Sequence, residues 1–409
     1  MTALTQHGRL VFDPYDYALQ EDPYPVYRRL RDEAPLYHNE EHDFWVISRH
    51  ADLHRAVRTD GVYSNEMGVS LDASAWTPYA HQTMSFLAMD PPRQTRLRKL
   101  VSKGFTPKRV AELEPQIQRI TDHYLDDAME SGELDWIGDF AGKLPMDVIS
   151  EMLGVPEADR DEVRRLADLL VHREPGLRDV PQVGIEAAMT LLDYYADLLA
   201  ERRQTPADDL TSALLRVGIE GAEDAGDRMT DEEITAFLIL MVVAGNETTT
   251  KLLGNALFHL TAHPDQLGRV FDDPGLVEPW IEETLRFDTS SQMVARHLLQ
   301  DVELHGKVAP AGSKLLIVLG SANRDERVFE RPDEYDIGRD KAELAQLLSF
   351  GGGRHFCLGA NLARLEARIA LEELVRRVRT VDVDRAGAVR VHSINVRGFK
   401  RLPVTVAAR

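Results

Sequence analysis

The sequence predicts a mainly α-helical protein with a smaller amount of β-structure, and three features support this fold class. Apolar residues recur at helical spacing through most of the chain, whereas Phe44–Ile47 is the clearest candidate for a strand. A long apolar helix is indicated between Thr230 and Thr261. No serine- or glycine-rich linker, internal repeat or low-complexity tract divides the 409 residues.

The expected helices follow one another from the amino terminus. A proline-bearing turn at 22–25 precedes a helical pattern through Leu30, and another turn at 89–92 precedes a basic helix over 93–104. Further helical patterns cover 110–129, 145–153, 161–171, 185–203 and 277–287. The stretch 173–184 contains proline and glycine and separates two of these helices. A loop of this length is either a lid over a binding site or a tolerated surface connection.

The central helix begins at a capping box, in which Thr230 is followed three residues later by Glu233. At ~1.5 Å per residue the pattern is roughly 45 Å long, enough to cross the molecule. Residues 234–244 are apolar on nearly every side, which indicates burial. This apolar stretch is too short to span a bilayer.

Polar residues interrupt the central helix at its middle. The interruption consists of Ala244, Gly245, Asn246, Glu247, Thr248, Thr249 and Thr250. Glycine costs up to ~1 kcal/mol relative to alanine in a helix, and threonine can hydrogen-bond to the preceding turn and bend the axis. A sequence that gives up helix stability at its buried centre suggests a functional site. Taken alone, a Glu-Thr pair on a helix is equally compatible with a structural role.

Cys357 is the only cysteine, so it cannot form an internal disulfide. The glycines 351–353 precede it, and a helical pattern over 358–376 follows. Backbone N–H groups and the positive end of the helix dipole stabilise negative charge, so we expect the thiol to ionise easily and to bind a metal. A small buried apolar cysteine is the ordinary alternative. A phosphate-binding loop is set aside because its Lys-Ser/Thr pair is missing.

The run from Phe350 to Gly359 resembles the haem-binding signature F-x-x-G-x-H/R-x-C-x-G of the cytochrome P450 family. The resemblance covers nearly the whole chain and implies the family's fold, mainly α with a long central helix and a small β-rich region, as a single domain over 1–409. It also implies that Cys357 is the proximal thiolate ligand of a b-type haem and that Phe350 lies against the cofactor. A thiolate ligand favours O–O bond cleavage.

The central polar residues also match this family, in its A-G-x-D/E-T element. The resemblance implies that Ala244 and Gly245 lie at the distal, oxygen-binding face of the haem, flanked by Glu247 and Thr248. Two protons must be delivered before one oxygen atom can leave as water. An alcohol can hold bound oxygen and an ordered water, while an acid brings protons from solvent.

Haem propionates need partners, because burying unpaired carboxylates is costly. The positions that match the family's propionate contacts are Arg98, Arg296 and His355. Gln94 departs from the family pattern, because many bacterial members have histidine there. Glutamine can donate one hydrogen bond but carries no charge.

Two further elements are predicted by the same resemblance. Glu283 and Arg286 lie three apart on one helix face. They match the family's E-x-x-R element with Arg339 as the third member, which makes all three structural; an exposed ion pair is the commoner explanation of such spacing. The segment 287–296 would line the substrate cavity, and its small hydroxyl residues stand where relatives often have proline. Those hydroxyls either contact a substrate or satisfy backbone groups.

The formal net charge of −20, from 48 basic and 68 acidic residues, makes nucleic acid an improbable partner. Residues 1–14 lack a basic segment followed by an apolar one, so no signal peptide is expected. A single cysteine fits a reducing compartment. We therefore expect a cytoplasmic monomer without a membrane anchor.

The predicted function is that of a haem-thiolate monooxygenase, which inserts one atom of O2 into a largely apolar small molecule by hydroxylation or epoxidation. The chain shows no iron–sulfur cysteine set and no G-x-G-x-x-G fingerprint, so electrons would come from a separate ferredoxin and an NAD(P)H-dependent reductase. Arg354, Arg364 and Arg368 are either contacts for an acidic ferredoxin or a solvated helix face.

Three alternatives remain at this stage. The first is a peroxygenase driven by hydrogen peroxide, against which the pair Glu247 and Thr248 argues, because peroxygenase relatives tend to lose it. The second is a non-enzymatic haem-binding sensor or carrier, and the third is a helical protein without a cofactor.

Overall fold

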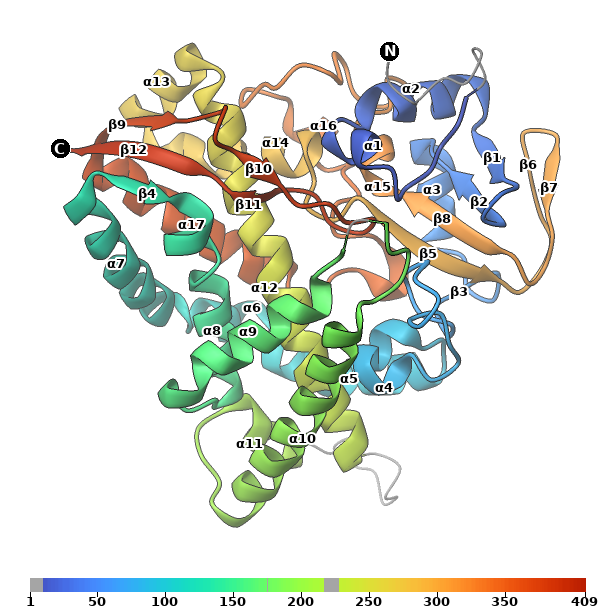
Figure 1. The fold of residues 1–409 in the computed structure, drawn as a ribbon, viewed down its shortest axis with the longest axis horizontal. Coiled ribbons are helices and arrows are strands. Elements are labelled where there is room, and N and C mark those ends of the chain that lie inside the picture. The colour runs from blue at the N-terminus through green and yellow to red at the C-terminus, as the bar shows by residue number, and fades with distance from the viewer. Residues whose placement is uncertain (1–9, 175, 217–227) are drawn as a thin grey trace.

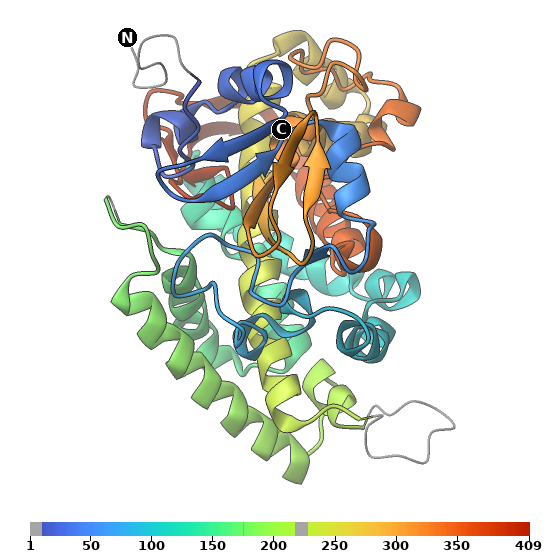
Figure 2. The ribbon, with the colours of Figure 1, turned by 90° about the vertical axis from the view of Figure 1, so that its right-hand side faces the viewer.

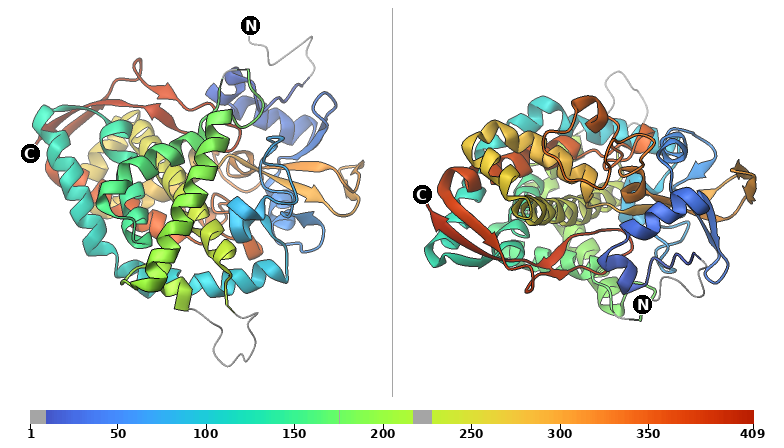
Figure 3. Two further views of the ribbon diagram at one scale, coloured as in Figure 1. Left: turned by 60° about the horizontal axis from the view of Figure 1, so that its bottom comes forward. Right: turned by 90° about the horizontal axis from the view of Figure 1, so that it is seen from above.

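The longest helix, α12 (Asp231–Thr261), runs through the middle of the molecule, as Figures 1 and 2 show. In the right panel of Figure 3 it is seen nearly end-on, with other elements around it. The structure, a computed structural model, describes residues 10–174, 176–216 and 228–409. Part of the segment in which no signal peptide was found, 1–9, lies outside the described residues.

The start of α12 confirms the predicted capping box. The Thr230 hydroxyl accepts a hydrogen bond from Glu233 N at 3.2 Å, and the Glu233 carboxylate accepts one from Thr230 N at 3.1 Å. By length and composition α12 could cross a membrane, but 78% of its most apolar 18-residue window is buried inside the fold. The helix is therefore a core element.

Two tryptophans fasten neighbouring elements to α12. Both side chains are fully buried. The indole N–H of Trp136 donates to Leu253 O at 3.2 Å, and that of Trp280 donates to Ala256 O at 3.0 Å. Aromatic packing and hydrogen bonding by these two tryptophans thus hold neighbouring elements against the carboxyl-terminal half of α12.

Helices make up most of the fold. Those before α12 are α1 (Tyr17–Glu21), α2 (Tyr24–Glu33), α3 (His50–Ala56), α4 (His81–Met84), α5 (Arg93–Val101), α6 (Pro107–Ala111), α7 (Glu114–Ser131), α8 (Leu144–Leu153), α9 (Arg160–Val171), α10 (Gln182–Gln204) and α11 (Leu210–Arg216). Those after it are α13 (Pro264–Asp272), α14 (Val277–Phe287), α15 (Leu319–Ala322), α16 (Lys341–Leu344) and α17 (Ala360–Arg377). Short 3₁₀ or π-helical turns occupy Ser85–Ala88, Ser102–Phe105, Trp136–Ala141, Glu157–Asp159, Pro274–Leu276 and Gly353–His355.

Within residues 10–174, 176–216 and 228–409, the strands form two larger sheets and two hairpin-sized ones. One sheet has five strands in the order β1-β2-β8-β5-β3, a second has the order β4-β12-β9, and β10 pairs with β11 and β6 with β7. The strands are β1 (Leu36–Asn39), β2 (Phe44–Ile47), β3 (Tyr63–Ser64), β4 (Glu133–Asp135), β5 (Met293–Leu298), β6 (Val302–Leu304), β7 (Lys307–Ala309), β8 (Lys314–Val318), β9 (Val378–Val383), β10 (Val389–Arg390), β11 (Phe399–Arg401) and β12 (Pro403–Ala408). The five-stranded sheet lies on the right of Figure 1 and the three-stranded one on the left.

Several predicted boundaries need correction. The single helix expected over 110–129 is two helices, α6 and α7, because Pro115 lies in the first turn of α7 and starts a new helix there. Helix α10 begins at Gln182 instead of residue 185, and the helix after the cysteine begins at Ala360 instead of residue 358. The expected strand Phe44–Ile47 and the helix Val277–Phe287 have the predicted bounds.

Candidate active site

A large internal cavity lies between α12 and the loop that carries Cys357. Its volume is about 270 Å³, and its wall is mostly apolar. Apolar lining residues include Val69, Phe86, Phe237, Leu240, Met241, Val294 and Leu319. Its polar lining comprises Arg98, Thr248, Thr249, Thr289, Ser290, Ser291, Arg296, Ser349, His355, Cys357 and Glu366. An apolar cavity with a few convergent polar groups is the usual form of a small-molecule site.

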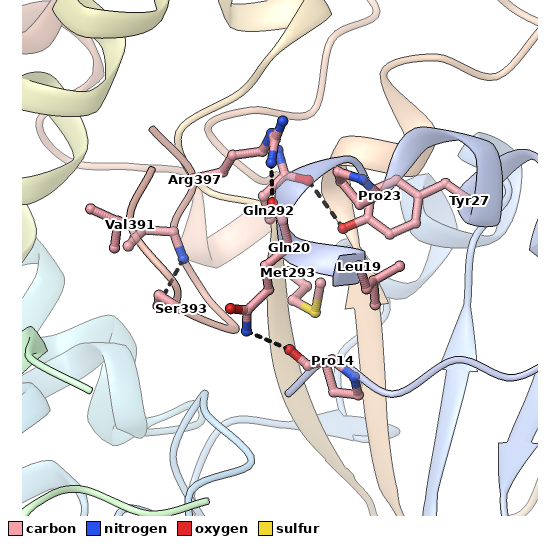
Figure 4. Close-up of a pocket in the computed structure, with 11 residues that line it drawn as sticks. Pro14, Leu19, Gln20, Pro23, Tyr27, Gln292, Met293, Val391, Ser393 and Arg397 are labelled. Atoms are coloured by element: carbon pink, nitrogen blue, oxygen red, sulfur yellow. Dashed lines mark hydrogen bonds between the residues drawn. The ribbon is translucent and has the colours of Figure 1, made fainter. Parts of the chain in front are cut away.

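A second cavity is much smaller. It lies between the amino-terminal helices and the carboxyl-terminal segment, where Gln20 donates to Pro14 O at 2.7 Å and Tyr27 donates to Gln292 at 3.1 Å (Figure 4). Its volume is about 20 Å³, room for about one water molecule. The larger cavity is therefore the candidate site.

The loop that carries the cysteine is held close to the end of α3. Cys357 N donates to Phe350 O at 2.9 Å, which closes the loop on itself. Gly353 has φ +60°, and a Cβ atom there would lie 2.2 Å from Val57 O. Only glycine fits this backbone and this contact, so the loop's course depends on it. Phe350 lines the cavity, with the Arg364 guanidinium 4.5 Å from its ring centroid.

The Cys357 thiol opens onto the cavity. Its environment corrects the expectation that it ionises easily, because burial deep in the protein raises its pKa. The Gly359 N–H and the charges of Arg98 and Arg364 act in the opposite direction but do not overcome burial. The position before a helix is therefore insufficient by itself to activate this thiol.

Three basic side chains around the cavity lack anionic partners. Arg296 is 6% exposed and burial lowers its pKa to about 10, while burial also lowers the pKa of Arg98. Neither arginine forms an ion pair with any carboxylate in the described part of the chain. Burial and the charges of Arg296 and Arg98 lower the pKa of His355 to about 3, and its buried Nδ1 has no hydrogen-bond partner among the described residues. Such a cluster fits an anionic ligand.

Gln94 does not reach the cavity. It is fully buried, and its Nε2 donates to Arg354 O at 2.8 Å, so its amide supports the backbone of the cysteine loop. Arg98 makes a parallel contact, from Nη2 to Phe356 O at 2.6 Å. Helix α5 therefore braces the loop at two carbonyl groups.

The opposite wall is formed by the polar interruption of α12. Ala244, Gly245 and Thr248 line the cavity. The Thr248 hydroxyl donates to Ala244 O at 2.9 Å, the back-bonding expected of threonine in a helix. A Cβ atom on Gly245 would lie 3.1 Å from the Ile149 side chain, so glycine here allows α8 to pack closely against α12.

Glu247 does not line the cavity. It is 8% exposed, and its Oε1 lies 3.0 Å from Lys251 Nζ, which also donates to Phe399 O at 3.0 Å. Asp168 on α9 interacts with this pair. Although part of its side chain is exposed, partial desolvation and the charge of Glu247 raise the pKa of Asp168 to about 6. An acid that titrates near neutrality thus lies next to Glu247 on the side of α9.

Two features of this region escaped the sequence analysis. One is the Lys251–Glu247 ion pair, which the i,i+4 spacing could have indicated. The other is Glu366, which lines the cavity at 1% exposure, with a pKa raised well above its usual value by burial. Its place on the apolar face of the cysteine helix, four residues after Leu362 and three before Ile369, was the available signal.

Glu283, Arg286 and Arg339 come together in the core. The Glu283 carboxylate accepts two hydrogen bonds from Arg286, both at 2.8 Å, and one from Arg339 at 3.0 Å. Arg286 also donates to Asn323 O and Pro332 O. None of the three lines the cavity, which suits a structural role.

The loop predicted as a lid is bonded to the segment that follows β3. Arg173 Nη2 lies 2.7 Å from Asp72 Oδ2, and the Asp179 carboxylate accepts hydrogen bonds from both N and Oγ of Ser74. Val69, Phe86 and Leu87 from that segment line the cavity. The described part of the loop contributes no lining residue to the cavity.

The three arginines considered for partner binding are all ion-paired. Arg354 pairs with Asp60 at 2.6 Å and Arg364 with Glu282 at 2.5 Å. Arg368 pairs with both Glu114 and Glu372.

Comparison with known proteins agrees with this geometry. The sequence model of the cytochrome P450 family matches residues 178–273 and 275–387. A protein of Mycobacterium tuberculosis (strain ATCC 25618 / H37Rv), provisionally named cytochrome P450 123, is 55% identical over 409 residues, which cover 100% of both chains. The vitamin D(3) 25-hydroxylase of Pseudonocardia autotrophica is 39% identical over 100% of this chain and 99% of its own.

A solved structure is similar as well. CYP109E1 from Bacillus megaterium in complex with testosterone has a TM-score of 0.86 and 32% identity, with 95% of this chain and 98% of that chain covered. The chain belongs to the cytochrome P450 family, and the predicted fold is confirmed. It is an enzyme of the monooxygenase class, which uses haem iron, dioxygen, electron-transfer partners and a small-molecule substrate.

Proposed function

We propose that Cys357 ligates the iron of haem b and that the enzyme oxygenates a largely apolar small molecule in the cytoplasm as a single-domain monomer. The observation that carries the proposal is the cavity itself, which has a thiol on one wall and the Thr248 hydroxyl on α12 on another. The donor set fits haem: one sulfur for iron, and unpaired basic groups for two propionates. Those groups are Arg98, Arg296 and His355.

Haem bound here would supply the activation of dioxygen and the transfer of one oxygen atom. The chain's own residues hold the cofactor and handle protons. Thr248, already oriented by its bond to Ala244 O, presents its hydroxyl oxygen to the cavity as an acceptor. Glu247 is positioned to pass protons from the side of α9, where Asp168 is partly exposed. The ion pair with Lys251 sets the resting orientation of Glu247.

The apolar wall supports a largely apolar substrate. Two similar proteins carry names that suggest first probes: a vitamin D(3) 25-hydroxylase and a structure in complex with testosterone. Sterols and steroids are therefore the first classes to test, followed by terpenoids, fatty acids and polyketide intermediates.

We propose that a ferredoxin and an NAD(P)H-dependent reductase supply the electrons. The ion pairs of Arg354, Arg364 and Arg368 leave them less available to a partner. Helix α5 contacts the cysteine loop through Gln94 and Arg98, and it also carries the exposed basic residues Arg93 and Lys99, which supply positive charge. Such a surface suits an acidic ferredoxin, and its binding should weaken as salt rises.

The test begins with haem ligation. The purified, reduced protein with carbon monoxide should show the red-shifted absorption typical of a thiolate ligand, and Cys357→Ala should abolish it. Retention of that band in the variant would remove Cys357 from the proposal. Substrate-dependent consumption of NAD(P)H with a ferredoxin and reductase, giving an oxygenated product, should then follow. Turnover with hydrogen peroxide alone at the same rate would replace the monooxygenase by a peroxygenase.

A further inference from the structure

Gln94, the residue that departs from the family pattern, contacts the cysteine loop and not the cavity. Its side chain is 1% exposed, and its Nε2 donates to Arg354 O at 2.8 Å. It is not among the residues that line the cavity, whereas Arg98, Arg296 and His355 are. The amide of Gln94 is therefore bound to the protein backbone, and the propionates are left to the three basic residues.

The carbonyl that Gln94 binds lies three residues before Cys357. The Phe356 carbonyl, one residue before the cysteine, accepts from Arg98 Nη2 at 2.6 Å. Peptide units are planar and each residue adds only two soft dihedral angles. Displacing the Arg354 carbonyl would therefore displace the cysteine sulfur as well.

Helix α5, which carries Gln94, is itself fixed in the fold. Leu97 is completely buried in the core. Arg96 donates to both carboxylate oxygens of Glu233, at 2.5 and 2.7 Å, which binds α5 to the first turn of α12. Gln94 and Arg98 are four residues apart and share one face of α5. The cysteine loop is thus held by a helix that is bound to α12, the opposite wall of the cavity.

The loop is held from two sides. On one side Gly353 lies against Val57 O at the end of α3, and on the other side Gln94 and Arg98 bind its carbonyl groups. A metal ligand has to be held within about 0.5 Å of its productive position, and the groups that orient it affect affinity or activity by about 10–100-fold. Because Gln94 does not line the cavity, its effect on the loop can be measured separately from cofactor contacts.

We propose that Gln94 is a positioning residue for Cys357: by holding the Arg354 carbonyl it fixes the turn that presents the sulfur, and it is not a propionate ligand. This inference rests on the proposed function, since it assumes that Cys357 ligates haem iron. Glutamine suits this role although many bacterial relatives have histidine here, because a bond to a backbone carbonyl needs a donor and no charge.

The test replaces the amide by a group of similar shape that cannot donate. In Gln94→Met, the thiolate-type absorption of the reduced carbon monoxide complex should convert in dilute urea to its shorter-wavelength form about three- to ten-fold faster than in the wild type, the range expected from losing one hydrogen bond. The haem reduction potential should become less negative, because a loosely held thiolate donates less electron density. Gln94→Asn, whose amide is one methylene too short to reach, should change both in the same direction.

Two control variants separate the carbonyl bond from other effects. Gln266 on α13 makes the same kind of bond outside the cavity, from Nε2 to Tyr335 O at 2.7 Å. Gln266→Met should leave both the conversion rate and the potential at their wild-type values. Arg354→Met removes the exposed ion pair with Asp60 but keeps the carbonyl that Gln94 binds. It should leave the conversion rate unchanged.

The reduction potential is a readout that a merely structural role would not move. The inference is overturned if Gln94→Met keeps the wild-type conversion rate and potential, or if either control variant speeds conversion as much. It is also overturned if Gln94→Met speeds only the transfer of haem to apomyoglobin, with absorption and potential unchanged, because that result identifies a propionate ligand. Absence of the thiolate-type absorption in the wild type would instead overturn the proposed function.

Discussion

At the scale of single residues, the site is defined by groups that the fold buries without partners. His355 Nδ1, Thr289 Oγ1, Ser290 Oγ and Glu366 Oε2 are all buried and unpaired among the described residues. Three of these residues belong to the segments, near 289 and near 357, that the motifs had pointed out. The sequence motifs indicated where polar residues cluster. Only the three-dimensional structure shows which of these polar groups already have hydrogen-bond partners.

The Thr248 hydroxyl gives the sharpest prediction at this scale. Thr248→Ala should leave haem and substrate binding within a few-fold of the wild type, because the residue adds no charge and its bond to Ala244 O is local. Loss of its hydroxyl should divert reducing equivalents to hydrogen peroxide, with coupling to product falling by ten-fold or more, since general acid–base groups contribute about 10²–10⁴-fold. The measurement is product and peroxide formed per NAD(P)H consumed.

A conservative variant separates chemistry from packing. Thr248→Ser keeps the hydroxyl and should restore most of the coupling. Equal coupling in Thr248→Ala and the wild type would contradict a role in proton delivery.

At the scale of elements, the cysteine loop depends on its contact with α3. Gly353 combines a positive φ with a backbone approach to Val57 O that leaves no room for a side chain. The sequence motif predicted a glycine turn, because three consecutive glycines favour one. Its cause, a neighbour about 300 residues earlier in the chain, was not predictable, since no local pattern specifies a contact between distant segments.

Gly353→Ala should destabilise the protein by at least about 1–3 kcal/mol and lower the fraction that retains haem, because the left-handed backbone and the contact are both lost or strained. Gly268→Ala is the matched control: this glycine lies within α13, and a Cβ there meets no atom within 4 Å. The control should be as stable as the wild type or gain up to ~1 kcal/mol. Urea unfolding of both variants distinguishes them, and equal stability would refute the steric explanation.

At the scale of the whole molecule, two buried charge clusters join segments that are far apart in the chain. One is the cluster of Glu283, Arg286 and Arg339. The other surrounds Asp288, which accepts from Tyr24 at 2.6 Å and from Arg397 at 2.8 Å. The first was anticipated from a motif. The second was not, because its members have no fixed spacing.

Glu283→Gln tests the first cluster. The change keeps the side-chain shape but leaves Arg286, which is fully buried, without its counter-charge, so we expect a loss of about 3–5 kcal/mol in the free energy of unfolding. Glu162→Gln is the control, because Glu162 and Arg165 form an ion pair with the same i,i+3 spacing on the surface. It should cause no measurable change. Similar effects of the two variants would contradict the structural role of the buried cluster.

The Asp288 cluster predicts a dependence of stability on pH. Burial alone would raise the pKa of Asp288, but the charges of Arg397 and Arg390 and the hydrogen bond from His259 hold it well below its usual value. Because the unfolded carboxyl takes up its proton first as the pH falls, this stabilisation is complete above about pH 5. It is lost progressively below about pH 4, as the pH approaches the much lower pKa of the folded state. Asp288→Asn should be less stable than the wild type at pH 7, and the difference should shrink as the pH falls. A difference that stays constant from about pH 5 down to about pH 2 would exclude this origin.

Because the cavity wall is also built from segments far apart in the chain, the point in synthesis at which the enzyme can bind its cofactor is constrained. The cavity wall begins at Val57 and is completed by Glu366, so its first and last contributions are separated by about 300 residues. At ~5–20 residues per second, a translating ribosome needs roughly 15–60 s to extend the nascent polypeptide between those points. Haem can therefore be bound only after almost the whole polypeptide has been synthesised. A chain truncated by a premature stop codon would lack part of the binding site.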